Sequence, residues 1–166
     1  MNMDSTLVGA MIGAVIAIIS VYITARQTLK NSSKLEEQKI IRQKREEAYL
    51  ACERCRNSIA SQELTILKFV ANAKHVPGNK FEPNNVHPHN QLRMLIFLYI
   101  PELKQDMEEL DKLALSFQRY YSFYVQAEIF LKYTPEEKNK FIDNASSIAK
   151  KMYETIEVIK QKLIVK

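Results

Sequence analysis

An uninterrupted apolar run near the N-terminus constrains this chain more than any other feature of its sequence. Residues 7–23 are apolar except for the polar atoms of Ser20 and Tyr22, and the run has no polar face. As an α-helix it would be about 25 Å long, and its weakly polar neighbours extend it toward the roughly 30 Å hydrocarbon core of a bilayer. A cleaved signal peptide normally begins with a basic segment, which is missing here, and no clear Ala-x-Ala cleavage site follows the run. Residues 5–25 are therefore predicted to form a retained transmembrane anchor.

The charges on either side of the run predict its orientation. Asp4 is the only charged residue before Arg26, whereas Arg26, Lys30 and Lys34 follow the run closely. Because an excess of Lys and Arg marks the cytoplasmic flank, we expect a single-pass protein of the bacterial inner membrane with its N-terminus outside and the rest of the chain in the cytoplasm. The presence of only two cysteines agrees with a reducing compartment.

Small side chains recur along one face of the predicted anchor. Ser5, Gly9, Gly13 and Ala17 are spaced four residues apart, which places them on the same side of a helix. Such a face lets another helix backbone approach closely, so it favours self-association within the membrane. The alternative is a smooth stripe that faces lipid.

The chain beyond the anchor is expected to be helical over long stretches. Neither Gly nor Pro occurs in residues 14–76, so the anchor should continue into a long helix that ends near residue 74. Residues 26–47 are charged and sparsely apolar, which is typical of a solvated stalk, although Asn-Ser-Ser at 31–33 could interrupt it. From residue 48 onward, small and apolar residues recur at the 3-4 spacing of a packed or coiled-coil helix.

A loop is expected at residues 75–91, where Pro-Gly, Pro-Asn-Asn and His-Pro-His sequences cluster. After it, residues 92–100 are almost wholly apolar and indicate a short buried helix that ends before Pro101. Residues 101–131 carry two apolar stripes and indicate a longer helix with neighbours on two sides.

The last helix is predicted to start at a capping box, with Thr134 at the cap and Glu137 three residues later. The fold class is therefore all-α: a single N-terminal transmembrane helix continues into a stalk helix and then into a cytoplasmic antiparallel helical bundle at residues 48–166. A content of only 3 Gly and 5 Pro argues against a turn-rich β-sandwich or barrel.

Two cysteines have the spacing of zinc ligands. Cys52 and Cys55 could be joined in a metal site by His75, His87 and His89. The cysteines, however, fall within a predicted helix and no second cysteine pair exists, so we favour their use as small apolar packing residues. The histidines are expected to lie in a solvated loop, because no cluster of carboxylates accompanies them. No metal or other cofactor is predicted.

The chain has a formal net charge of +5, and its basic part lies near the predicted stalk. Arg42, Lys44 and Arg45 are the candidate patch there. On an upright helix Arg42 would stand several Debye lengths beyond the membrane, so its attraction to lipid headgroups would be screened. These charges either solvate the stalk or bind an acidic partner, such as a nucleic acid.

Aromatic side chains are concentrated in one helix of the predicted bundle. With an interleaved arginine, such a cluster can stack nucleic-acid bases. Because the aromatic residues fall on the two apolar stripes of the helix, packing in the core is the favoured interpretation. The cluster consists of Phe117, Arg119, Tyr120, Tyr121, Phe123 and Tyr124.

No phosphate-binding loop, nucleophile elbow, zinc-protease motif or paired-carboxylate motif is found in the sequence, so an enzyme is not expected. An anchor, a small-residue face and a helical bundle together indicate a protein that acts through contacts with other proteins. The expected partners are the lipid bilayer, further copies of the chain, and an unidentified cytoplasmic protein or nucleoprotein complex.

In the order of its parts, with an anchor at residues 7–23 followed by a helical domain, the chain resembles the small membrane-anchored effectors of bacterial anti-phage defence systems, including those associated with retrons. The resemblance covers this layout and no residue motif. It implies a protein that disrupts the membrane once infection is sensed and that a defence complex otherwise holds inactive.

Two other functions fit the same layout. A passive adaptor would use the anchor only to hold a cytoplasmic complex at the membrane. A phage lysis protein of the spanin type would need its large domain outside the cell, which the flanking charges contradict.

Overall fold

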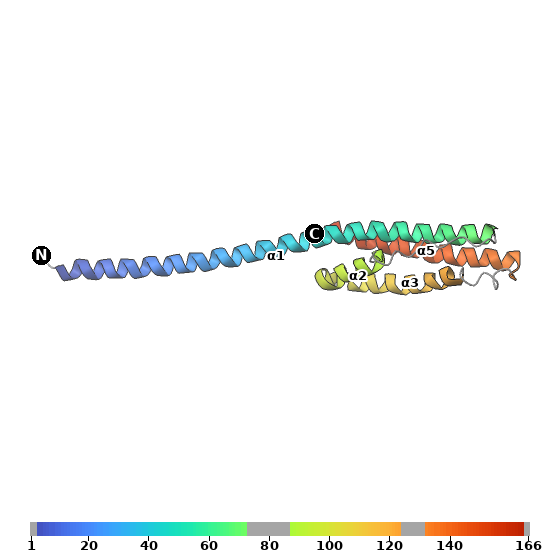
Figure 1. Ribbon diagram of the computed structural model, residues 1–166. Coiled ribbons are helices and arrows are strands. Elements are labelled where there is room, and N and C mark those ends of the chain that lie inside the picture. The colour runs from blue at the N-terminus through green and yellow to red at the C-terminus, as the bar shows by residue number, and fades with distance from the viewer. Residues whose placement is uncertain (1–2, 73–86, 124–131, 165–166) are drawn as a thin grey trace. The chain divides into compact units, whose positions relative to one another are not determined.

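The protein is all-α in the residues that its computed structural model describes, which are 3–72, 87–123 and 132–164 (Figure 1). The chain divides into two compact units, Met1–Arg42 and Gln43–Lys166. The described elements, in chain order, are α1 (Met3–Asn72), α2 (Pro88–Tyr99), the 3-10 turn η1 (Pro101–Leu103), α3 (Lys104–Phe123) and α5 (Pro135–Ile164). This architecture confirms the predicted all-α class, with a long N-terminal helix and a helical bundle.

The first unit consists of one helix, formed by the N-terminal residues of α1. The continuous helix predicted from the sequence is confirmed, and the alternative of a break at residues 31–33 is not, since α1 remains helical through Asn-Ser-Ser. Hydroxyl groups on this helix donate to its own backbone: Thr24 Oγ1 to the Ser20 carbonyl at 2.8 Å, and Thr28 Oγ1 to the Thr24 carbonyl at 2.9 Å. Such internal bonds leave no unpaired hydroxyl donor at these two threonines. Every residue described from 10 to 42 is exposed to solvent within the chain.

The second unit is a helical bundle in which residues 43–72 of α1, α3 and α5 lie alongside one another (Figure 1). The long-range pairs show the directions of the helices. Lys162 near the end of α5 contacts Asp106 near the start of α3, and Tyr153 of α5 contacts Glu63 of α1. Arg45, at the start of this part of α1, contacts the carbonyl of Leu163 at the end of α5. Helix α5 is therefore antiparallel to both of its neighbours, as the sequence predicted.

One apolar core joins all the helices of the bundle. Its fully buried members come from α1 (Ala48, Ala51, Cys52), α2 and its end (Leu92, Ile96, Ile100), α3 (Met107, Leu110) and α5 (Ala149, Ile159). Alanine and cysteine on α1 leave room for the larger leucine, isoleucine and methionine side chains of the other helices. The predicted 3-4 stripe of α1 is thus the side that faces the core.

The short helix α2 starts earlier than the sequence indicated. It begins at Pro88, so residues 88–91, which were expected to belong to the loop, are helical. The preceding His87 acts as its cap, because its side chain accepts a hydrogen bond from the backbone N–H of His89. Proline suits the first turn of a helix, where its missing N–H has no partner to lose. The rest of the predicted loop lies outside the described residues, apart from His87 itself.

The helix expected to open at Pro101 instead opens with the 3-10 turn η1, and α3 follows from Lys104. The backbone N–H of Leu103 donates to the carbonyl of Ile100 at 3.0 Å, which tightens the corner between α2 and α3. Leu103 is only 1% exposed, so this corner also contributes to the core.

The capping box at the start of α5 forms as predicted. The backbone N–H of Thr134 donates to Glu137 Oε2 at 2.7 Å, and the backbone N–H of Glu137 donates to Thr134 Oγ1 at 3.3 Å. The Thr134 hydroxyl also donates to the same carboxylate oxygen at 2.9 Å. These hydrogen bonds lower the pKa of Glu137, the backbone bond from Thr134 most of all. Two backbone donors at the start of the helix are thereby satisfied.

Replacing the cap, Thr134→Ala, is expected to lower the free energy of unfolding of the bundle by about 1 kcal/mol. Because the folded-state pKa of Glu137 is lowered, its contribution is present above the unfolded value of 4.5 and is lost as the pH falls through the folded value. Urea denaturation of the detergent-solubilised chain at pH 7 and pH 3 measures both effects. The variant should differ from wild type more at pH 7 than at pH 3, and an equal difference at both would contradict the role of the carboxylate.

Candidate functional site

The apolar part of α1 is the first candidate site. In the part of the chain that the structure describes, α1 is long and apolar enough to cross a membrane. None of the residues in its most apolar 18-residue stretch, near the N-terminus, is buried. Length and composition alone would not distinguish it from a signal sequence. A Cβ atom built on Gly13 meets nothing within 4 Å, and Ala17 is exposed. Gly9 lies on the same helix, but the described side chains begin at Ala10. This face is therefore open in a single copy of the chain.

Two of the three residues in the candidate basic patch are bound within the bundle. The guanidinium of Arg45 is 12% exposed; it contacts Glu102 at 2.6 Å and donates to the Leu163 carbonyl at 3.4 Å. Lys44 contacts Glu47 at 2.8 Å and lies over the ring of Tyr99, 5.6 Å from its centre. The second unit consequently starts at Gln43, five residues before the expected start of the bundle at residue 48.

Arg42, the third residue of the patch, is the last residue of the first unit and is exposed. Lys44 and Arg45 make separate contacts inside the second unit. Arg45 in particular is a structural residue that ties α1 to η1 and to the end of α5.

Further ion pairs join the same end of the bundle. Lys160 of α5 is 7% exposed, contacts Glu53 of α1 at 2.5 Å and Glu157 at 3.2 Å, and lies over the Tyr49 ring. The hydrogen bond to Glu53 is the main cause of the raised pKa of Lys160. Sequence reasoning missed this group, because the residues it joins are far apart in the chain and no local spacing connects them.

Together these ion pairs connect the helices to one another at this end of the bundle. The pair of Arg45 and Glu102 joins α1 to η1. Lys162 of α5 makes two contacts of 2.8 Å with Asp106 of α3. Lys160 of α5 pairs with Glu53 of α1. Ion pairs of this kind add little net stability but disfavour arrangements in which a charge would be buried without its partner.

Cys52 and Cys55 are free and buried, at 0% and 3% exposure. Burial is the main cause that raises the pKa of both thiols to about 12. Since the thiolate is the form that binds metals and attacks electrophiles, the folded protein holds both cysteines in an unreactive state. In the described residues no group of three His, Cys, Asp or Glu side chains is placed to hold a metal ion.

The two described histidines are not merely solvated loop residues. His89 Nε2 lies 2.6 Å from Asp111 Oδ1 of α3, and Arg93 of α2 contacts the same carboxylate at 3.4 Å. Burial lowers the pKa of His87, which favours the neutral ring that caps α2. His89 was expected in a solvated loop, but it lies in α2 and contacts Asp111, which is 22 residues away in the sequence. His75 is outside the described residues.

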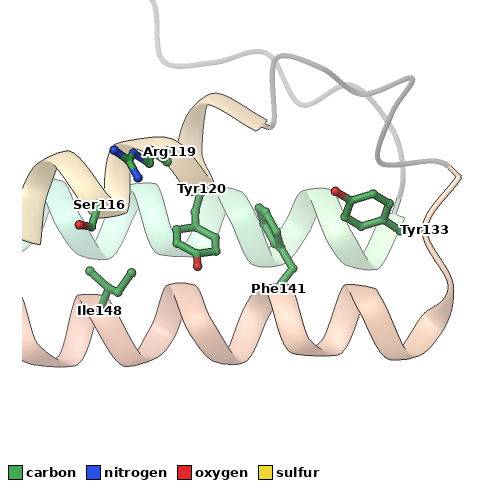
Figure 2. Close-up of a pocket in the computed structure, with 6 residues that line it drawn as sticks. All are labelled: Ser116, Arg119, Tyr120, Tyr133, Phe141 and Ile148. Carbon is green, nitrogen blue, oxygen red and sulfur yellow. The ribbon is translucent and has the colours of Figure 1, made fainter.

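A pocket of about 500 Å³ lies between α3 and α5 (Figure 2). In the described part of the chain it is lined by Ser116, Arg119, Tyr120, Tyr133, Phe141 and Ile148. The rings of Tyr120 and Phe141 meet edge to face with their centres 5.1 Å apart. Two members of the predicted aromatic cluster, Arg119 and Tyr120, therefore line a cavity.

The remaining members of that cluster have different positions. Phe117 is 1% exposed and belongs to the core, while Tyr121 is partly buried against it. Phe123 ends α3, and Tyr124 is outside the described residues. The pocket residues Tyr133, Phe141 and Ile148 could not be predicted as partners of Tyr120 from the sequence, because only the antiparallel packing of α5 on α3 brings them together.

Comparisons with known proteins identify no relative of this chain: no family model, no curated protein and no solved structure matches it.

Proposed function

We propose that this chain is a single-pass membrane protein that acts through contacts with other proteins, its helical bundle lying in the cytoplasm. The proposal is carried by the apolar stretch of α1 near the N-terminus, in which no residue is buried. Residues 10–23 of this helix expose nearly all their side chains, including Ile18 and Val21 at 69% each, and a bilayer is the environment in which such a surface is stable. The same helix contributes its C-terminal part to the core of the bundle.

The more specific form of the proposal is a membrane-disrupting effector of an anti-phage defence system. Its support is the layout resemblance described above, together with the open surface at Gly13. Several copies would associate through Gly9, Gly13 and Ala17 and so perturb the bilayer. A cytoplasmic protein or nucleoprotein complex would hold the chain inactive until infection.

Expression of the protein alone in bacteria tests this form. Induced wild type is expected to depolarise the inner membrane and admit a dye, whereas Gly13→Ile is expected to do neither. The larger side chain meets no atom of its own chain, so a loss of activity reports contacts between copies.

The matched control is Val15→Phe, which adds apolar bulk on the opposite side of the same helix, about 200° around its axis. It should behave like wild type, and all three proteins should be recovered from the membrane fraction. Intact membranes after induction of wild type would overturn the effector proposal. Equal activity of wild type and Gly13→Ile would overturn assembly through this face.

A passive adaptor is the second candidate, and one surface favours it. On α2, Met94 and Leu98 are one turn apart and are 53% and 66% exposed. Contiguous patches of exposed apolar side chains mark protein-binding surfaces, and in an adaptor this pair would form part of such a patch. An adaptor would leave the membrane intact when expressed alone, and an intact membrane followed by capture of one defined complex on the wild-type bundle, lost in Leu98→Glu, would favour it.

A further inference from the structure

One side of α1 carries a stripe of polar side chains where the apolar stretch of this helix ends. The members of the stripe are all exposed and follow one another at intervals of four residues: Tyr22, Arg26, Lys30 and Lys34. On an α-helix, neighbours at this spacing lie only about 40° apart around the axis. The whole stripe belongs to the first unit of the chain, not to the bundle.

The positive charge of the stripe is not balanced by acidic residues nearby. Residues 26–35 contain three basic residues and no acidic one, and the first acidic residue after Asp4 is Glu36. Residues 36–42, in contrast, contain two acidic and two basic residues. The unbalanced charge is therefore confined to about three helical turns that directly follow the apolar stretch.

The length of the helix places this charge beside the surface of any bilayer that the apolar stretch spans. Counted from Ile23 along the helix, Arg26 and Lys30 lie roughly 5 and 10 Å beyond the hydrocarbon core. Lys34 lies roughly 17 Å beyond it, and the headgroup layer fills about the first 5–8 Å. Helical side chains also point back toward the helix N-terminus, which here means toward the bilayer. All three charges thus come within about one Debye length of the headgroups.

The residues at the two ends of this segment agree with such a placement. Tyr22 is 66% exposed, and tyrosine is enriched at the membrane–water interface, where its ring is covered and its hydroxyl group is hydrated. Glu36 comes roughly 20 Å beyond Ile23, where the potential of a charged bilayer surface is largely screened. An anionic surface would repel an acidic side chain that was any closer.

We propose that the basic stripe of Arg26, Lys30 and Lys34 binds the headgroups of anionic phospholipids in the bilayer that α1 spans. Basic side chains near such a surface are attracted to it, and they donate hydrogen bonds to phosphate oxygens. The inference rests on the proposed membrane span. It depends neither on membrane disruption nor on the orientation of the chain.

Electron spin resonance of spin-labelled lipids tests the proposal on the full chain in phosphatidylcholine vesicles. The label is carried by phosphatidylglycerol or by phosphatidylcholine, and the fraction that the protein immobilises gives the association of the anionic lipid relative to the neutral one. Phosphatidylglycerol is expected to associate at least about twofold more strongly. In about 1 M salt, where the Debye length falls to about 3 Å, this preference should disappear.

Two triple variants locate the binding surface. The first replaces the basic residues of the stripe with glutamine, which has a similar helix propensity, and should lower the relative association to about one. Its substitutions are Arg26→Gln, Lys30→Gln and Lys34→Gln. The matched control removes the same charge at exposed positions of α1 in the second unit and should keep the wild-type preference. Its substitutions are Arg54→Gln, Arg56→Gln and Lys68→Gln.

Flotation of the vesicles in a density gradient separates this inference from the proposed function. A wild-type chain that does not float with the vesicles would overturn the membrane span, and this inference with it. A chain that floats but shows no preference for phosphatidylglycerol at low salt would overturn only the inference. The same holds if the stripe variant keeps the preference, or if the control variant loses it equally. Circular dichroism of each variant establishes that its helices are intact.

Discussion

A Val15→Arg variant is expected to disappear from the membrane fraction of expressing cells. Val15 lies at the middle of the apolar run, where insertion of a charged side chain costs about 2.5–3.5 kcal/mol. Its own side chain is 54% exposed, and the residue belongs to the first unit, so the substitution removes no contact in the core of the bundle. Loss of membrane association would thus report the role of the apolar helix directly. Fractionation of lysed cells with an alkaline carbonate wash measures it.

Leu115→Arg is the matched control for this experiment. Leu115 is also an exposed apolar residue, at 64%, but it lies on α3 in the bundle. This variant should remain in the membrane fraction at the level of wild type. If Val15→Arg stayed there as well, the bundle rather than α1 would hold the chain at the membrane, and a transmembrane role for residues 5–25 would be wrong.

The sequence was most informative where local chemistry decides the structure. The continuous helix follows from the lack of Gly and Pro in residues 14–76, and the start of α5 follows from the Thr134 capping box. Helix α2 was also predicted, because the almost wholly apolar run at residues 92–100 needs a core to cover it. Each of these predictions depends on residues within a few turns of one another.

The sequence was least informative where residues far apart decide the structure. The charges of Lys44 and Arg45 resemble those of the stalk before them, and only the fold shows that Glu102 and the end of α5 bind Arg45. His89 likewise finds Asp111 only once α2 packs on α3. A charge pattern shows that a face is polar, but it does not show whether water or another side chain satisfies it.

The location of the pocket has a similar origin. The sequence identifies Arg119 and Tyr120 as part of an aromatic and basic group, and the position of the aromatic residues on the two apolar stripes of the helix favours packing. In the structure Phe117 lies in the core, whereas Tyr120 is half-buried and meets Phe141 of α5.

Substitution of a buried and of an exposed leucine on α3 tests which side of this helix packs in the core. Leu110→Ala is expected to lower the free energy of unfolding by about 2–5 kcal/mol, because Leu110 is 0% exposed and its removal leaves a cavity in the core of the bundle. Leu115→Ala makes the same chemical change on the same helix at a residue that is 64% exposed, and should cost no more than about 0.5 kcal/mol.

Thiol labelling of the full chain in detergent micelles, measured against urea concentration, reports this difference on the bundle alone. The chain has only two cysteines, and both are buried in the core, so a maleimide reacts with them only after the bundle opens. The midpoint of labelling should fall markedly for Leu110→Ala and stay near that of wild type for Leu115→Ala. Equal midpoints for the two variants would mean that α3 presents a different face to α1 and α5. A lowered midpoint for Leu110→Ala alone would establish that the buried stripe of α3, and not the helix as such, holds the bundle together.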